Sequence, residues 1–391
     1  MGIRVAIVDD NPHVAWDGRI YPVNATFQHF AAALLDLPGS PVASITSCVP
    51  LREADVAPGS LPLDQRIEVV GTAPFDGIEG YLGHLRSLLR ANRPTLVRAL
   101  ADADLVWVKV PASNAALAGA IAARAGIPRV VWVAGSAGEV AAGRYHGPSA
   151  IGARAIGSAY DLVGQLAGVG GRRLVVGAGI VDGDGVVASL VSPGELRDPE
   201  RRSWPPDADH ARLVWAGRLA PGKGLEALIA AVASDPTLAL DVLGDGPDRA
   251  RLMAMAEASG ASQRITWAGH LAARQTYLER LAAADAFVFP SPAEGFPKVV
   301  LDAFAVGLPV LATRAGGLVE LADGQLLVPI ERSDPIDILA AWSKLRASDP
   351  LKVAALRRGA HAFAASHTRP AEAARLVARW TEWWPDLPWG R

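Results

Sequence analysis

The sequence predicts an α/β protein with two domains, each built on a parallel sheet. Its 391 residues exceed one ordinary domain, which holds roughly 100–200 residues. Half of the residues are hydrophobic, which is enough to fill two cores. Short apolar runs alternate with amphipathic stretches, and residues 286–313 read as strand, loop, helix and strand in succession. Such a βαβ unit joins two parallel strands of one sheet.

The first domain is expected over residues 1–181. Residues 3–8 predict a buried first strand, a polar loop covers residues 9–24, and a helix over 25–37 ends at Pro38-Gly39. Further strands are expected over residues 42–46, 67–70, 105–110, 130–133 and 173–176, and helices over 80–101, 115–125 and 150–167.

The composition changes over residues 182–211, where prolines, aspartates and arginines predict a linker between the domains. The second domain is then expected over residues 212–368. Its strands are predicted over 212–216, 238–243, 265–269, 286–289, 309–312 and 326–328, with helices over 225–233, 249–259, 277–284, 297–307, 335–347 and 351–366.

An amphipathic helix is expected over residues 369–391, where four tryptophans gather. Tryptophans supply a large apolar area if they pack on another part of the protein, and they also favour membrane interfaces beside arginines. The first interpretation is favoured, and the return of this helix to the first domain is what the family resemblance described below implies. A peripheral membrane contact is the alternative.

The composition also excludes several classes of protein. The net charge of −2 gives no electrostatic basis for binding nucleic acid. Cys48 is the only cysteine, so no internal disulfide can form, which fits a reducing cytoplasm. No apolar run has the length of a transmembrane helix, and the N-terminal run is too short for a signal peptide.

A polar loop follows the predicted strand 286–289, at the end where open α/β sheets bind their ligands. The backbone N–H groups of residues 295–298 open a helix there, which favours an anion by roughly 0.3–1 kcal/mol. Gly295 allows a ligand to approach the backbone closely. The carboxylate of Glu294 projects into the same space, and Asp302 follows on the helix after seven intervening residues.

A basic loop follows the predicted strand 212–216. It contains Arg218, whose planar fork suits phosphate, and Lys223, a mobile point charge. A second glycine-rich turn at residues 244–247 is weaker evidence, because it lacks the third glycine of a dinucleotide fingerprint. Together these loops indicate a ligand that carries phosphate.

With these loops on one domain, the sequence resembles glycosyltransferase family 4, whose members are retaining enzymes of the GT-B fold. Glu294-Gly295-Phe296-Pro297 with Asp302 looks like the family's Glu-x7-Glu signature. Gly217-Arg218-Leu219 with Lys223-Gly224 is similar to its Gly-Arg-Leu-x4-Lys-Gly motif. The resemblance is close over residues 212–325 and covers 1–181 only in overall pattern. It implies two Rossmann-like α/β/α domains that face a central cleft.

The resemblance further implies a retaining, metal-independent transfer from a nucleotide-diphosphate sugar, which is a co-substrate, so no bound cofactor is expected. Arg218 and Lys223 would stabilise the diphosphate, and Glu294 would bind hydroxyl groups of the donor sugar. The implied donor residues are Gly18, Arg218, Lys223, Gly244, Leu271, Glu294, Gly295, Phe296, Pro297, Lys298 and Asp302, of which Glu294, Arg218 and Lys223 are catalytic.

Asp302 departs from the family, because a glutamate is usual at this position and aspartate is one methylene shorter. We expect a shifted helix, a bridging water or a weaker contact with the donor ribose. Family members also carry histidines after the strands 105–110 and 130–133, where this chain has Lys109 and Ala134. The acceptor and its base are therefore left open.

The candidate acceptor residues are Lys109, Asn114, Arg144 and His146. The acceptor is expected to be a small molecule or a glycan. Three alternatives stay open: another enzyme on the same architecture, such as an epimerase or a phosphorylase; a binding module that has lost its chemistry; and a membrane-associated enzyme with a lipid acceptor. A glycosidase carboxylate pair is disfavoured, since phosphate-binding residues flank Glu294.

Overall fold

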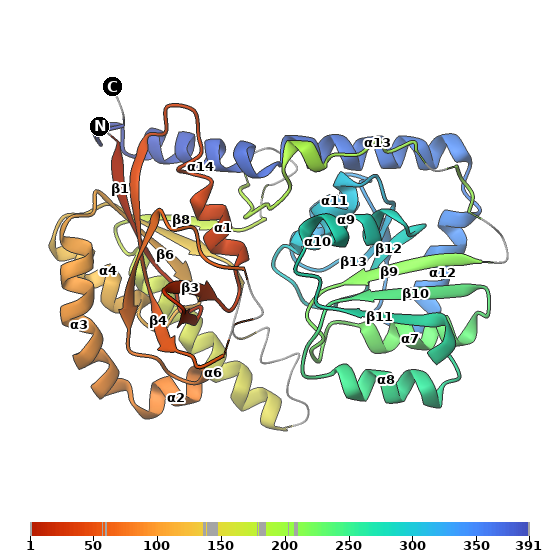
Figure 1. The fold of residues 1–391 in the computed structure, drawn as a ribbon, viewed down its shortest axis with the longest axis horizontal. Coiled ribbons are helices and arrows are strands. Elements are labelled where there is room, and N and C mark those ends of the chain that lie inside the picture. The colour runs from red at the N-terminus through yellow and green to blue at the C-terminus, as the bar shows by residue number, and fades with distance from the viewer. Residues whose placement is uncertain are drawn as a thin grey trace. The chain divides into compact units, whose positions relative to one another are not determined.

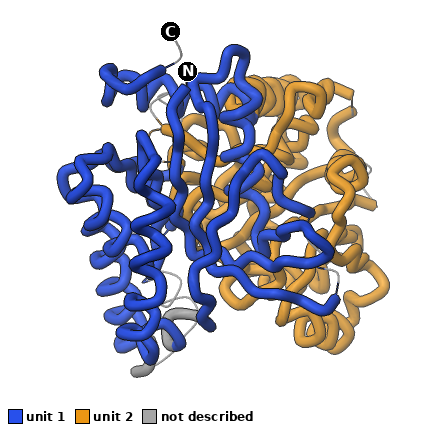
Figure 2. Tube along the Cα trace, turned by 60° about the vertical axis from the view of Figure 1, so that its left-hand side comes forward, with its two compact units in different colours: residues 1–176, 369–391 blue, residues 177–368 orange. Residues whose placement is uncertain are grey.

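The computed structural model describes residues 2–56, 58, 61–135, 138, 148–177, 179, 185–201, 203–206 and 210–389. The chain divides into two compact units, shown in Figure 2. Unit 1 comprises residues 1–176 and 369–391, and unit 2 comprises residues 177–368. None of the helices in these described ranges has the length and hydrophobicity needed to cross a membrane.

Unit 1 is built on an eight-stranded sheet, which Figure 1 shows with some of its strands and helices labelled. The strands are β1 Ile3–Val8, β2 His13–Trp16, β3 Arg19–Pro22, β4 Val42–Glu53, β5 Ile67–Thr72, β6 Leu105–Val110, β7 Arg129–Val133 and β8 Arg172–Val175. The helices are α1 Thr26–Ala32, α2 Gly77–Gly83, α3 Leu85–Ala101, α4 Ala115–Arg124, α6 Pro148–Gln165 and α14 Arg369–Trp383, with a short 3-10 turn η1 Leu166–Gly168.

The parallel strands of unit 1 lie in the order β5-β4-β1-β6-β7-β8. The chain starts at β1 in the middle, builds outward through β4 and β5, and returns to β6 on the other side of β1. The neighbouring strands β1 and β6 therefore mark a topological switch point, where their connections run in opposite directions. Ligands of doubly wound sheets bind beside such a point, at the carboxyl ends of the strands.

One part of unit 1 contradicts the sequence-based expectation. Residues 9–24 were predicted to be a polar loop, but His13–Trp16 and Arg19–Pro22 pair as the antiparallel strands of a hairpin. Asp17 and Gly18 form its two-residue turn, and both have positive φ angles, of 47° and 68°. An Asp-Gly pair is a typical signal for this turn. The turn gives a structural reason for the glycine, and the donor-binding role of Gly18 stays a prediction.

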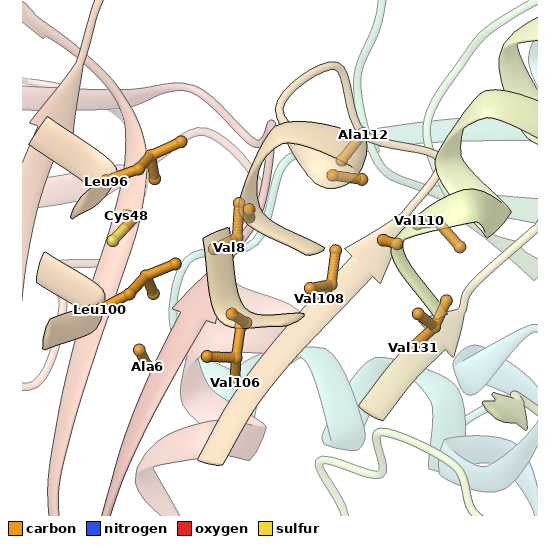
Figure 3. Close-up of a cluster of buried hydrophobic side chains, with 14 residues drawn as sticks. Ala6, Val8, Cys48, Leu96, Leu100, Val106, Val108, Val110, Ala112 and Val131 are labelled. Atoms are coloured by element: carbon orange, nitrogen blue, oxygen red, sulfur yellow. The ribbon is translucent and has the colours of Figure 1, made fainter. Parts of the chain in front are cut away.

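One hydrophobic cluster of unit 1 lies between the sheet and the helices α3 and α4, as Figure 3 shows for Val106, Val108 and Leu96. Cys48 belongs to this cluster, and burial raises the pKa of its thiol to about 12. A thiol in this environment stays protonated and unreactive.

Unit 2 contains a six-stranded sheet in the order β11-β10-β9-β12-β13-β14, with every pair parallel. Its strands are β9 Ala211–Ala216, β10 Leu238–Leu243, β11 Ile265–Gly269, β12 Ala286–Phe289, β13 Val310–Thr313 and β14 Val328–Ile330. Its helices are α7 Leu225–Ser234, α8 Arg249–Ala258, α9 Arg274–Ala282, α10 Lys298–Ala305, α11 Leu318–Asp323, α12 Pro335–Arg346 and α13 Pro350–Ser366, with 3-10 turns η2 Pro193–Glu195 and η3 Ser262–Arg264.

This order repeats that of unit 1, with the switch point between β9 and β12. The predicted α/β class with two doubly wound parallel sheets is therefore confirmed.

The division between the units differs from the expected linker over residues 182–211. Val186, Val187 and Ala188 are almost completely buried, and the backbone N–H of Arg197 donates to the carbonyl of Ala305 at 2.9 Å. Glu195 forms an ion pair with Arg274 at 3.0 Å. The described part of this segment is thus packed structure within unit 2, which its polar composition did not indicate.

Helix α14 belongs to unit 1 and is anchored by Trp380. Its indole is fully buried and meets the indole of Trp107 edge to face, with ring centroids 5.3 Å apart. Trp383, farther along the helix, is partly exposed, and the guanidinium groups of Arg172 and Arg379 lie 5.7 and 6.0 Å from the centroid of its ring. The tryptophans of the tail therefore divide into a buried anchor and a more accessible group.

We expect Trp380→Ala to lower the free energy of unfolding by about 3–5 kcal/mol, because it leaves a large cavity against Trp107. Denaturant titration would measure the change. Trp384→Ala, at a half-buried position beyond the end of α14, is the control and should cost much less. Equal losses in the two variants would contradict the assignment of Trp380 as the anchor.

Candidate active site

The loops after β9 and β12 meet at the switch point of unit 2. Lys223 comes from the loop after β9 and Glu294 from the loop after β12, and the lysine Nζ lies 2.7 Å from the glutamate Oε1. The Glu294 side chain is only 13% exposed, whereas that of Lys223 is 33% exposed. The structure thus brings together two residues that the sequence analysis placed on separate loops, and it pairs them directly.

Glycine allows these two loops to touch. Gly224 has a φ of +71°, and a Cβ at this position would lie 2.1 Å from the carbonyl oxygen of Pro290. The hydroxyl of Thr313 donates to the carbonyl of Ser291, which ties the second loop to the end of β13. A side chain at residue 224 would push the loops apart and would separate Lys223 from Glu294.

A further contact on the Glu294 loop was not predicted. Gly316 has a φ of +53°, and a Cβ there would lie 2.0 Å from the carbonyl oxygen of Glu294 and 2.4 Å from that of Gly295. The backbone N–H of Gly317 donates to the carbonyl of Gly295 at 2.7 Å. The Gly-Gly pair after β13 therefore fixes the loop that carries the glutamate. In the sequence, this contact was indicated only by the position of the two glycines directly after a predicted strand.

The ends of β9, β10 and β11 also approach through glycine. A Cβ on Gly244 would lie 1.9 Å from the carbonyl oxygen of Gly217, and the N–H of Gly244 donates to Gly269. This close approach of two backbones explains why residue 244 is a glycine. Leu271 is half-buried on the loop between β11 and α9. The donor-binding roles of both residues stay predictions.

The remaining residues of this site differ in accessibility. Arg218 is exposed, and its side chain forms no hydrogen bond or ion pair with the residues that the structure describes. Pro297 was expected to begin the helix, but it is the N-cap residue of α10. The helix begins one residue later, at the half-buried Lys298. Phe296 is buried, and its ring lies near Gly317. Phe296 can therefore offer a ligand its backbone but not its ring.

Asp302 lies in a buried network rather than in an open position. Its Oδ1 accepts from the Arg274 guanidinium at 2.6 Å, and its Oδ2 accepts from the Tyr277 hydroxyl at 3.2 Å. Burial by itself would lower the pKa of Arg274, but the charge of Asp302 and the hydrogen bonds with Asp302 and Glu195 raise it. Burial and the charge of Asp302 raise the pKa of Tyr277 well above its usual value. Both carboxylate oxygens that the resemblance assigned to the ribose are therefore engaged already.

The candidate acceptor residues of unit 1 are similarly occupied. The Nζ of Lys109 lies 3.0 and 3.1 Å from the two carboxylate oxygens of Asp9. Asn114 is buried, and its side-chain oxygen accepts from the Asn92 amide at 3.2 Å. Arg144 and His146 lie outside the described residues. The two described candidates are thus parts of internal networks.

A second polar cluster was missed by the sequence analysis. It lies at the switch point of unit 1, where Asp10 follows β1 and Ser113 follows β6. The backbone N–H of Ser113 donates to Asp10 Oδ2, and the Tyr160 hydroxyl donates to the same oxygen at 3.0 Å. Burial raises the pKa of Asp10 above its usual value. The Asp9-Asp10 pair directly after the first strand was the signal in the sequence.

The two doubly wound sheets, each with polar loops at its switch point, define an α/β protein of the GT-B fold. The sucrose-phosphate synthase of Thermosynechococcus elongatus superposes on 98% of this chain and on 99% of its own chain, with a TM-score of 0.68 and 16% identity. Residues 197–337 match the family model described as "Glycosyl transferases group 1". The chain therefore contains a domain of that group.

Two curated relatives show what the chain is similar to. The lipopolysaccharide core biosynthesis glycosyltransferase LpsE of Rhizobium meliloti (strain 1021) is 29% identical over 187 residues, which are 48% of this chain and 54% of that protein. A GDP-mannose-dependent phosphatidylinositol monomannoside mannosyltransferase of Mycolicibacterium smegmatis is 29% identical over 278 residues, which are 65% of this chain and 70% of that protein. The chain thus spans about half of the first relative's length.

Gly316→Ala should disturb the loop that carries Glu294. Alanine at a positive φ costs roughly 1–2 kcal/mol, and the collision with the Glu294 carbonyl adds to this cost. Gly260→Ala is a matched control, because Gly260 has a φ of +72° with no atom within 4 Å of the added Cβ. Denaturant titration should show the larger loss for Gly316→Ala. Equal losses of stability in the two variants would contradict a special role for the contact between Gly316 and the carbonyl of Glu294.

The stability of the protein should depend on pH through Asp10. Burial raises the pKa of Asp10, so the stabilisation that its protonated form contributes is lost as the pH rises from the usual pKa of an aspartate through the raised one. Asn cannot ionise, so the melting temperature of Asp10→Asn relative to the wild type should become more positive over that range.

Asp104 is the control with the opposite sign. The hydrogen bond from Arg4 lowers the pKa of Asp104, so its contribution is present above its usual pKa and is lost in acid. The melting temperature of Asp104→Asn relative to the wild type should therefore become more negative with rising pH. Parallel curves for the two variants would contradict the assigned direction for Asp10.

Proposed function

We propose that the protein is a retaining glycosyltransferase that moves a sugar from a nucleotide-diphosphate sugar to an acceptor hydroxyl. The observation that carries this proposal is the contact between Lys223 and Glu294 at the switch point of unit 2. It joins a cation suited to phosphate and a carboxylate suited to sugar hydroxyls. Both lie within the residues that match the glycosyl transferases group 1 model.

The chemistry would need no covalent intermediate with the enzyme. The acceptor oxygen forms a bond to the sugar's anomeric carbon, and the bond from that carbon to the phosphate oxygen breaks. The acceptor proton goes to the leaving diphosphate, so atoms and charges balance. Negative charge grows on the departing oxygen, and fixed positive groups lower the barrier most when they point at such a charge.

Lys223 and Arg218 would supply that positive charge. The Lys223 ammonium has three donors, so it can keep Glu294 as a partner and still donate to the diphosphate. Arg218 offers its planar fork without giving up another contact with a described residue. The backbone at the start of α10, with Gly295, Pro297 and Lys298, would add its dipole to the same phosphates.

Glu294 would accept hydrogen bonds from the donor sugar and so fix its ring. Lys223 holds the carboxylate in place before the donor arrives, which reduces the ordering needed on binding. Asp302 would reach the ribose only through a water or after releasing Tyr277, because both of its oxygens are engaged. The scheme uses no metal ion and no bound cofactor.

The expected donor is suggested by the name of a relative, and the expected location by the composition. The mannosyltransferase relative is named for GDP-mannose, so this donor should be tried first, with UDP-sugars second. The acceptor is a small molecule or a glycan. A cytoplasmic location stays an expectation based on the composition, as does the absence of nucleic acid binding.

A donor screen tests the proposal. The wild type, Glu294→Gln and the exposed control Glu257→Gln would be followed by thermal shift and by release of nucleoside diphosphate. A bound donor must raise the melting temperature. Loss of a hydrogen bond to the carboxylate should reduce release by roughly 10–100-fold in Glu294→Gln and leave Glu257→Gln near the wild type.

Three results would contradict the proposal. Stabilisation by a nucleotide sugar without any turnover, even with acceptor mixtures, would support a binding module instead. Conversion of the sugar without release of nucleoside diphosphate would support an epimerase. The absence of stabilisation by every nucleotide sugar at millimolar concentration would remove the donor assignment altogether.

A further inference from the structure

The cluster around Asp10 occupies the ligand-binding position of a doubly wound sheet. It lies at the carboxyl ends of β1 and β6, which are neighbours with connections in opposite directions. In unit 2 the equivalent position holds Lys223 and Glu294. Unit 1 therefore has a polar site in the corresponding position, with different chemistry.

The hydrogen bonds of this cluster leave one atom unused. Tyr160 donates to Asp10 Oδ2, so Ser113 Oγ, at 2.6 Å from the tyrosine oxygen, must be the donor to Tyr160. The hydroxyl of Tyr81 donates to the Ser113 carbonyl at 2.9 Å, which holds the loop from a third side. Asp10 Oδ1 is buried and has no partner among the described residues. A buried oxygen in this state is explained by a ligand or by water.

The charges around the cluster favour a neutral ligand. Asp9 and Lys109 neutralise each other through two contacts. Burial lowers the pKa of His13, which keeps its ring uncharged near neutral pH. Burial also raises the pKa values of Asp10, Tyr81 and Tyr160, so both phenols stay protonated. The charged group that acts on the pKa of Asp10 is the carboxylate of Asp9, and a second negative charge beside Asp10 disfavours a phosphate or carboxylate ligand there.

We propose that Asp10, held by Ser113 and Tyr160, binds a hydroxyl group of a neutral sugar or polyol acceptor. A hydroxyl both donates and accepts, so it can satisfy Oδ1 whether the carboxyl is ionised or protonated. The acceptor role rests on the proposed function, whereas the binding of a polyol does not. The proposal gives the acceptor a chemical class and predicts that phosphorylated acceptors are disfavoured at this site.

Binding of matched probes to the full chain, without any donor, tests this assignment. The probes are glucose with glucose 6-phosphate and myo-inositol with inositol 1-phosphate, and saturation-transfer NMR gives their affinities. At least one neutral probe should bind more tightly than its phosphorylated partner. Asp10→Asn should weaken that binding by about tenfold or more, and Tyr160→Phe should weaken it by several-fold.

Nucleoside diphosphate affinity is measured in parallel and should change little in both variants, because Asp10 and Tyr160 lie outside unit 2. This second readout separates loss of the acceptor site from general unfolding, and Tyr160→Phe replaces Asp10→Asn if the latter does not fold. If the protein binds a polyol but no nucleoside diphosphate, the result contradicts the proposed function and leaves the polyol site standing.

The inference is overturned if no neutral probe binds at millimolar concentration, which would leave water as the partner of Oδ1. It is also overturned if a phosphorylated probe binds more tightly, or if both variants keep the wild-type affinity for the neutral probe.

Discussion

The contact between Lys223 and Glu294 depends on backbone atoms that approach more closely than side chains would allow. Gly224 and Gly316 each face a carbonyl oxygen at a distance that excludes any Cβ, and both adopt positive φ angles. The two charges are consequently held at 2.7 Å in a partly buried position. An ion pair of this kind contributes little to stability on its own. We infer that its main consequence is a fixed arrangement of opposite charges before any ligand arrives.

The same strand order appears twice, and it places polar residues at the same point of each sheet. Unit 2 presents a pair of opposite charges there, whereas the corresponding cluster of unit 1 combines a buried carboxyl with two hydroxyl groups. The topology determines where a ligand site lies, and the loop residues determine which chemistry it offers. Two unlike ligands can therefore be recognised by two copies of one architecture.

The sequence predicted the elements whose signals are local. Continuous apolar runs gave the parallel strands, and glycines with Arg218, Lys223 and Glu294 marked the loops of unit 2. The hairpin over His13–Pro22 was missed although its Asp-Gly turn is a local signal, because the polar residues were interpreted as a loop. The networks at Asp302 and Asp10 could not be predicted in this way. Arg274 lies 28 residues from Asp302, and Tyr160 lies 150 residues from Asp10, so only the folded chain brings them together.

The position of α14 has a consequence for how the protein is made. Unit 1 is assembled from both ends of the sequence, so the residues of unit 2 are synthesised before the helix that carries Trp380. Until that helix arrives, the indole of Trp107 lacks the ring that covers one of its edges. A nascent chain that holds all of β1 to β8 therefore still exposes an apolar surface of its first unit. Completion of that unit must wait until residues 369–383 have been synthesised after unit 2, and a chaperone that binds exposed aromatic groups would have its longest opportunity in that interval.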